Sequence, residues 1–211
     1  MMRSLHSLVL VSAAALLSGC ISLLPEPAPA PRLFALEALP REDQTPRALD
    51  VVVAVSAPSG EGVLLGSGLV WRSGDELEFI AQTRWSTRAE DALQGMLIET
   101  FENDTGVRAA LRVGEARSDY LVRWSVLDFQ IEESGAGQRA RFVAQANVLR
   151  TTTREVLRST RVDTSADLSS RSASLAADAL ARAAREGSAR IAAFAAETIA
   201  ADQSSAASIS R

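Results

Sequence analysis

The chain has 211 residues, of which 47% are hydrophobic and 23% are charged, and its formal net charge at pH 7 is −4. This composition is sufficient for one domain with a packed core. It excludes the basic surface of a nucleic-acid-binding protein and the low hydrophobicity of a disordered chain. All 22 basic side chains are arginine, and the chain has one histidine, His6, and one cysteine, Cys20.

The N-terminus has the pattern of a lipoprotein signal peptide. An apolar run at residues 7–17 follows a short basic start and is too short to span a bilayer. Leu17, Ser18, Gly19 and Cys20 resemble the bacterial lipobox, which predicts cleavage before the cysteine and acylation of its thiol. A secreted protein with an incidental cysteine is the alternative, but lipidation explains a lone cysteine. Its acyl chains would anchor the protein to a lipid bilayer.

The residues after Cys20 indicate which membrane holds the protein and what kind of segment links the lipidated cysteine to the domain. In enteric-type bacteria, an aspartate at the next position retains lipoproteins in the inner membrane, and this chain has Ile21 there. We therefore expect the periplasmic side of the outer membrane rather than the inner membrane. Proline alternates with other residues at 25–31, which is typical of a semi-rigid polyproline II stalk. A disordered tether is the alternative.

Removal of the signal peptide would change the chemistry open to the protein. The mature chain would contain no histidine, no lysine and no free thiol. Histidine is the commonest general base and metal ligand near neutral pH, and both Ser-His-Asp and Ser-Lys arrangements would be missing. The usual ligands of zinc, copper and haem would be missing too. We therefore expect no catalytic residue, no metal site and no cofactor, and a protein that is not an enzyme.

Apolar runs predict the strands in the first part of the chain. Short strands are expected at Leu33–Leu36 and Val51–Val55, the second buried on both faces because it is a continuous apolar run. Residues 58–62 are expected to form a loop. Leu69–Arg72 and Leu77–Ile80 flank a polar turn and predict a β-hairpin.

A period close to 3.6 then predicts a helix that begins near Ala89. Thr87 and Glu90 have the spacing of a capping box, in which each side chain accepts a hydrogen bond from a free backbone N–H. Apolar residues fall on one face of the helix until Asn103–Gly106 ends it.

Three long strands are expected next. Residues 120–131 alternate with a period of two, but the phase changes near Leu127, which predicts a β-bulge. Strands near 140–148 and 155–164 follow, the last with Val156 and Val162 facing inward. Together the three predict an antiparallel meander.

The C-terminal part predicts a long alanine-rich helix at Ser169–Ala201, with Gly187–Ser188 as a place where it could be interrupted. We expect its apolar face to pack on the domain's own sheet. The fold class is then mixed α/β (α+β), with a single small domain in which an antiparallel meander belongs to a mixed sheet. An amphipathic helix and the long C-terminal helix would cover one face of that sheet.

These elements also divide the chain. We expect a signal peptide at 1–19, the lipidated cysteine and proline-rich stalk at 20–32, one folded domain at 33–201 and a flexible tail at 202–211.

The chain has three tryptophans, each of which could lie in the core or contact a partner. Trp124 alternates in phase with its strand and is expected in the core. Trp71 lies beside the hairpin turn and Trp85 at the entry to the helix, so each has more scope for partial exposure than Trp124. Tryptophan and arginine are common anchors of interfaces, so Trp71, Arg84 and Trp85 are the candidate partner contacts. Core packing of the two tryptophans is the alternative.

The order of these features resembles the ABC-type transport auxiliary lipoproteins, a family of PqiC-like, MCE-associated lipoproteins. The resemblance extends over residues 33–199, and the loop at residues 57–66 departs from the family pattern. It rests on the following segments in order: the lipobox, the strands at Leu33–Leu36 and Val51–Val55, Leu69–Arg72, Arg84-Trp85 before the helix, Asp119–Leu121 and the alanine-rich helix.

The resemblance implies a TolB-N-terminal-like arrangement of the domain. It also implies a non-catalytic adaptor of an MCE/ABC-type system that moves phospholipids between the inner and outer membranes. The partners implied are an MCE-domain protein of the transporter and other copies of the chain in a homo-oligomeric ring. One alternative is a structural lipoprotein of envelope assembly that binds another outer-membrane or peptidoglycan-associated component. A lipid carrier with its own cavity is another.

Overall fold

The structure is a computed structural model that describes residues 29–38, 49–135 and 137–209. The predicted signal peptide, the lipobox with Cys20 and most of the stalk lie outside the described residues. Within the described residues, no helix is both long enough and apolar enough to cross a membrane.

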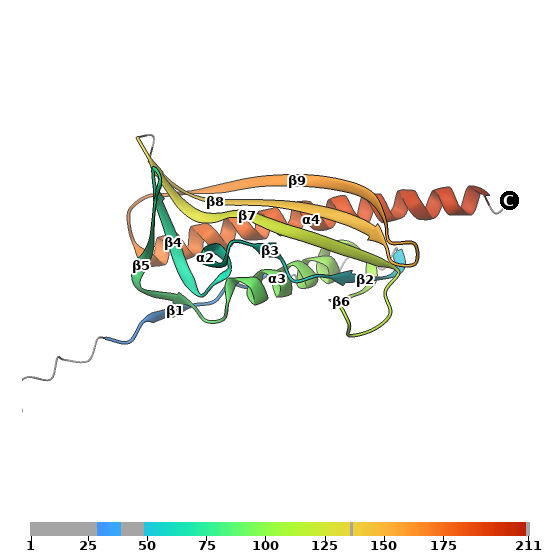
Figure 1. Cartoon of the computed structure of the whole chain (residues 1–211), viewed down its shortest axis with the longest axis horizontal. Helices are drawn as coiled ribbons and strands as arrows, with labels where there is room; N and C mark the ends of the chain where they lie inside the picture. Colours follow the sequence, from blue (N-terminus) through green and yellow to red (C-terminus); the bar gives the residue numbers. More distant parts are fainter. Residues whose placement is uncertain (1–28, 39–48, 136, 210–211) are drawn as a thin grey trace, which may run out of the picture. The chain divides into compact units, whose positions relative to one another are not determined.

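The sheet is built around its longest strand, β7 (Tyr120–Ser134). One edge of β7 pairs antiparallel with β8 (Gly137–Arg150), and β8 pairs antiparallel with β9 (Glu155–Leu168) (Figure 1). This is the predicted meander. The pairing of β7 with β8 shifts register between Val126 and Asp128, so the predicted bulge at Leu127 is confirmed.

Three strands from the first half of the chain share the other edge of β7. They are β2 (Leu49–Val55), β3 (Ser59–Gly60) and β4 (Gly68–Ser73), and all three run parallel to β7. Val51, Val53 and Val55 on one face of β2 belong to the core. On the other face Ala54 is buried but Val52 is only partly buried, so the predicted burial on both faces is confirmed for one face and only in part for the other.

Two groups of strands extend the sheet from these neighbours of β7. Beyond β2 lies β6 (Val107–Arg112), parallel to it. Beyond β4 lies β5 (Glu76–Trp85), which forms the predicted hairpin with β4. The short β1 (Arg32–Phe34) pairs parallel with the end of β5.

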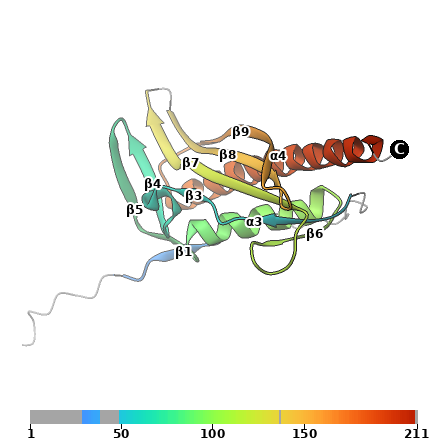
Figure 2. The same cartoon turned by 45° about the vertical axis from the view of Figure 1, so that its right-hand side comes forward.

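Three helices complete the domain, and the two long ones lie on the same face of the sheet (Figures 1 and 2). α3 (Ala89–Asp104) packs against β2 and β6, and α4 (Ala173–Ile209) packs against β7, β8 and β9 as well as against α3. The short α2 (Gly62–Leu65) lies beside β4 and β7. The mixed α/β class and the covered face are therefore as predicted.

The core lies between the two long helices and the sheet. Phe129 is at its centre, stacked on Trp85 at 5.8 Å between ring centroids and edge-on to Phe142 at 6.1 Å. The face of α4 toward the sheet consists mostly of buried alanines, and these small side chains let the helix axis approach the strands closely. The buried alanines of α4 are Ala176, Ala177, Ala179, Ala181, Ala183, Ala184, Ala192 and Ala195.

One inward-facing residue of β9 was predicted wrongly. Val162 is buried, but Val156 is 52% exposed. The pairing of β8 with β9 shifts register between Val148 and Leu149, and the shift reverses which residues face the helix. Leu157, the extra residue at the shift, packs against the core instead. Arg158 is exposed, with its guanidinium 4.9 Å from the ring centroid of Phe194.

The ends of the helices also differ from the predictions. α4 is continuous through Gly187 and Ser188 and extends to Ile209, so the predicted end at Ala201 and the tail at 202–211 are wrong as boundaries. No capping box forms at α3, where the N-cap is Arg88 and no side chain caps the helix. Instead the Ala89 N–H donates a 2.9 Å hydrogen bond to the carbonyl of Gly66.

The first part of the chain contains two elements that were expected to be loop. β3 falls within the expected loop at 58–62, and α2 begins at the end of that loop. Near the stalk, the strand expected at Leu33–Leu36 is observed as β1, Arg32–Phe34.

Candidate partner-binding site

Two of the three candidate contact residues belong to the core. Trp71 and Trp85 are each 2% exposed, so they have the core role that was the alternative to partner contact. Trp71 Nε1 donates a 3.0 Å hydrogen bond to Glu133 Oε2, and the guanidinium of Arg171 lies 4.7 Å from the centroid of its ring. Trp85 is buried by its stacking on Phe129. As predicted, Trp124 is also in the core.

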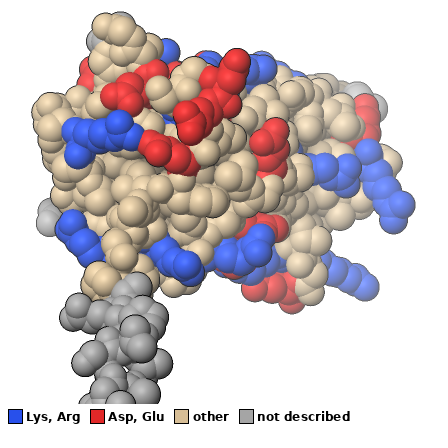
Figure 3. Space-filling model, turned by 60° about the vertical axis from the view of Figure 1, so that its left-hand side comes forward, with Lys and Arg blue, Asp and Glu red and all other residues tan. Residues whose placement is uncertain are grey.

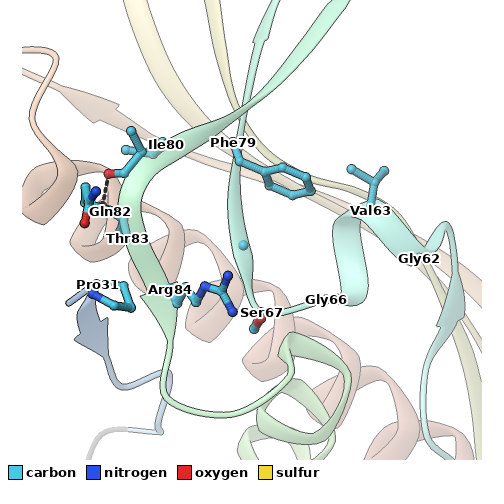
Figure 4. Close-up of a pocket in the computed structure, with 12 residues that line it drawn as sticks. Pro31, Gly62, Val63, Gly66, Ser67, Phe79, Ile80, Gln82, Thr83 and Arg84 are labelled. Carbon is cyan, nitrogen blue, oxygen red and sulfur yellow. Dashed lines mark hydrogen bonds between the residues drawn. The ribbon is translucent and has the colours of Figure 1, made fainter. Parts of the chain in front are cut away.

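Arg84, the third candidate, is exposed and lines a cavity of about 460 Å³ (Figure 4). The cavity lies between β5 and the segment that leads from α2 into β4. Its lining combines apolar side chains, backbone at three glycines and one guanidinium. The lining residues are Pro31, Gly62, Val63, Gly66, Ser67, Gly68, Phe79, Ile80, Ala81, Gln82, Thr83 and Arg84.

A bulge in β5 shapes this cavity. Gly68 pairs with Arg84 and Val70 with Phe79, so residues 80–83 stand opposite the single residue between Gly68 and Val70. Gln82 lies within the bulge at φ 55°, in the left-handed region that side chains other than glycine adopt rarely. Bulges of this kind bend a strand and redirect its side chains.

The bulge brings Phe79 and Arg84 to the same side of β5. Residues five positions apart in a regular strand point to opposite faces. In Figure 4, however, both side chains point toward Ser67 and α2, with Pro31 on the other side of the strand. An apolar ring and a guanidinium therefore line one cavity.

The ring of Phe79 lies across the backbone of β4. A Cβ atom built on Gly68 would lie 2.4 Å from Phe79 Cδ1, so any larger residue at position 68 would displace the ring. Phe79 is nevertheless 59% exposed. It therefore offers one side of its ring to the surface while the other covers the glycine.

A second cavity, of about 250 Å³, also borders β5 and is lined by Phe79, Ile80 and Ala81 together with Trp71 and Arg171. Arg171 closes one end of it, since its guanidinium forms ion pairs with Glu78 of β5 and with Glu133 of β7. Hydrogen bonds from Gln138 and Trp71, with the charge of Arg171, hold the pKa of Glu133 below its usual range. Glu133 is thus a fixed anion that orients Trp71 and Arg171.

The surface around these cavities is mainly uncharged at its centre. Figure 3 shows an end of the molecule with a broad face of uncharged residues and with arginines and acidic residues around its rim. Leu77 and Phe79 are exposed on β5, and Leu33 on β1. Contiguous exposed apolar residues with a polar rim are typical of interaction sites.

The residues around β5 support binding by shape and charge. Among the residues that the structure describes, no group of three or more His, Cys, Asp or Glu side chains is placed to hold a metal ion. The cavities offer apolar contact, one guanidinium and the edge of a strand. We therefore treat the surface around β5 as the candidate partner-binding site.

A family model for the ABC-type transport auxiliary lipoprotein component matches residues 34–193. The chain belongs to this family. The match includes the hairpin, α3, the meander and the first half of α4, so the family assignment rests on the folded domain itself. No curated protein matches this auxiliary lipoprotein.

Solved structures share the fold. A crystal structure of a Xanthomonas campestris protein, described as a member of the DUF330 family, is 20% identical with a TM-score of 0.73. The alignment covers 82% of this auxiliary lipoprotein and 99% of that chain. A second crystal structure, of an uncharacterized protein, is 13% identical with a TM-score of 0.63, covering 79% of this chain and 99% of the other.

Sequence reasoning found Arg84 but missed the rest of the site. The cavity depends on the bulge at residues 80–83, and no turn residue or break in polarity marks it in the sequence. The segment Gly66-Ser67-Gly68 leads from α2 into β4. Its glycines carried the signal, because a glycine in a strand often marks close approach of another group, here the ring of Phe79.

Proposed function

We propose that this auxiliary lipoprotein is anchored through acylated Cys20 to the periplasmic side of the outer membrane. There it acts as a non-catalytic adaptor of an MCE/ABC-type system that moves phospholipids between the two membranes. The observation that carries the proposal is the family match over residues 34–193. The lipobox at residues 17–20 supports the anchor.

The candidate partner-binding site is consistent with an adaptor role. An adaptor needs a surface that another protein can bind, and the end of the sheet at β5 combines exposed apolar side chains with an arginine that lines a cavity. Aromatic and arginine side chains contribute most of the binding energy in many interfaces. The proposed partner is the MCE-domain protein of the transporter.

Co-purification from cells that express the full, lipidated chain tests the proposal. We expect an affinity-tagged copy to recover the MCE-domain protein of its own organism after mild detergent extraction. Recovery of an outer-membrane or peptidoglycan-associated protein in place of the MCE-domain protein would contradict the proposal and favour the structural role. Loss of all association, with the domain folded, would contradict it as well.

The anchor is tested separately with Cys20→Ser. This variant cannot be acylated, so we expect it in the soluble periplasmic fraction. The unchanged chain is expected in the outer-membrane fraction of a density gradient. If the variant stayed with the membranes, attachment through Cys20 would be wrong. If the unchanged chain sedimented with the inner membrane, the proposed outer-membrane location would be wrong.

A further inference from the structure

We propose that the free edge of β5 binds an extended segment of a partner protein as an added strand of the sheet. The segment would carry apolar side chains at alternate positions and an acidic side chain that meets Arg84. This inference rests on the proposed function for the identity of the partner, and it names the chemistry and the conformation that the partner must present.

The edge itself is the first observation. One edge of β5 pairs with β4, and β1 occupies the other edge only at Thr83–Trp85. Along Glu76–Gln82, no strand in the described part of the chain covers this outer edge. Its regular part, Glu76–Phe79, would span about 10 Å at the usual rise of a strand residue, before the bulge at residues 80–83. An uncovered edge presents backbone N–H and C=O groups that can pair with another strand.

β1 shows that this edge accepts an extended segment. Arg32, Leu33 and Phe34 pair with it in parallel register, although they are distant from β5 in the sequence. A partner segment paired with Glu76–Gln82 would lie in line with β1 along the same outer edge of β5. The bound strand would thus extend an existing pairing rather than create a new one.

The side chains of β5 provide for an apolar segment. Leu77 and Phe79 are 44% and 59% exposed and stand two residues apart, so they share one face of the strand. Both cavities reach β5 at Phe79–Ala81. In strand addition, backbone hydrogen bonds supply affinity while pockets for alternate side chains supply specificity.

The other outer edges of the sheet are less suited to accept a strand. β9 carries charged residues throughout its length, including Arg161, Asp163 and Asp167, and β6 carries Arg108 and Arg112. Charges on an edge strand oppose pairing with another chain. β5 carries Glu76 and Glu78 at its first end, with Glu78 ion-paired to Arg171, but it has no charged residue from Phe79 to Thr83. This uncharged part is where an apolar segment is favoured.

Arg84 determines the charge that the bound partner segment should carry. Its side chain is exposed at the cavity, and no ion pair joins it to an acidic residue within the described ranges. A guanidinium binds a carboxylate through two parallel hydrogen bonds when the geometry allows. An acidic side chain near the end of the bound segment therefore complements the site, and a basic one would be repelled.

Photo-crosslinking in cells tests this inference on the full, lipidated chain. The probe is p-benzoylphenylalanine, placed at Leu77 or Phe79. The matched control carries it at Val156, an equally exposed apolar residue on β9. We expect positions 77 and 79 to crosslink to one segment of a partner protein. Mass spectrometry should locate that segment and show the alternation of apolar residues with an acidic residue.

Several results would overturn the inference. They are crosslinks to a second copy of the chain, crosslinks to phospholipid, crosslinks to a helical or basic segment, or a yield at both positions no higher than at Val156. Two charge variants add a second measurement. Leu77→Asp and Arg84→Glu should each lower recovery of the partner about tenfold. The matched variants Val156→Asp and Arg161→Glu should leave it unchanged, and circular dichroism should show all four folded.

The design separates this inference from the proposed function. If positions 77 and 79 capture an extended acidic segment of a protein other than an MCE-domain protein, the strand-addition site stands and the transporter assignment falls. If the MCE-domain protein is recovered undiminished with Leu77→Asp and with Arg84→Glu, the transporter assignment stands and this site is wrong.

Discussion

Gly187 of α4 lies against the ring of Phe142 in β8, so close that a Cβ atom on Gly187 would be 2.3 Å from Phe142 Cδ1. On the next strand, Thr164 Oγ1 donates a 2.7 Å hydrogen bond to the carbonyl of Ala183 in the same helix. Both contacts need the helix backbone close to the sheet. Gly187, at which the sequence predicted that the helix could be interrupted, is therefore the residue where the helix backbone approaches the sheet.

Gly187→Ala should lower the free energy of unfolding by about 1–3 kcal/mol. Phe142 is fully buried and cannot move away from the added methyl group, so the core is overpacked. Urea unfolding at pH 7 measures the change. Gly95→Ala in α3 is the matched control, because a Cβ atom there would have only the end of the Arg112 side chain nearby, at 4.0 Å. Since alanine favours helix, that variant should gain up to about 1 kcal/mol.

Asp202→Asn should destabilise the domain by about 1–2 kcal/mol at pH 7. Asp202 accepts a 2.9 Å hydrogen bond from the Tyr120 hydroxyl and forms an ion pair with Arg150. The hydrogen bond from Arg150, with that from Tyr120, holds the pKa of Asp202 below its usual range. Its stabilisation is therefore complete above the unfolded pKa of about 4 and is lost as the pH falls through the lowered folded value.

Urea unfolding at pH 7 and at pH 3 checks both the size and the sign of this effect. The difference between the natural chain and Asp202→Asn should shrink at the lower pH, and a difference that grew there would contradict the account. Asp178→Asn removes an exposed pair with Arg182 one turn away on α4. This control should cost no more than about 0.5 kcal/mol.

Tyr120 should titrate near pH 12 in the folded protein. Burial, followed by the hydrogen bond to Asp202, raises the pKa of this phenol from 10.0 to about 12. Because the chain has one tyrosine, ultraviolet absorbance after a rapid pH jump reports this group alone. In Asp202→Asn the midpoint should fall but remain above 10, since burial persists. A midpoint near 10 in the natural chain while still folded would refute the assignment.

Gln82→Gly should stabilise the domain by up to about 1 kcal/mol, because glycine adopts the positive φ of 55° in the β5 bulge without strain. Gln82→Val should destabilise it by about 1–2 kcal/mol, since a β-branched residue fits this region poorly. Thermal unfolding followed by circular dichroism ranks the variants. Ala81→Gly is the control and should be destabilising, because the neighbouring Ala81 does not have a positive φ and gains nothing from glycine there.

The strands and the long helices could be predicted because the spacing of apolar residues, two in a strand and about 3.6 in a helix, can be recognised within each segment of the sequence. The bulge at Leu127 was predictable for the same reason, since apolar residues on both sides of it show the change of phase. The bulge that exposes Val156 was not, because it lies in the pairing between two strands and leaves no change of phase within β9.

The burial of Trp71 shows why the site was harder to predict than the fold. Its ring is covered by Arg171 and its Nε1 is bound by Glu133, both far away in the sequence. A tryptophan beside a turn is exposed unless distant residues cover it, and only the folded chain brings them together. The cavity at Arg84 is hidden in the same way, since α2 and the bulge of β5 form it jointly.

The position of β7 also constrains how the protein can fold. In the described part of the chain, the β2–β6 pair and the β1–β5–β4 group share no pairing except through β7. Until β7 has been synthesised, the first half of the chain therefore lacks the strand that joins its two groups of strands. Such long-range pairing makes folding slow. A chain truncated before β7 would be two unsupported fragments rather than a smaller version of the domain.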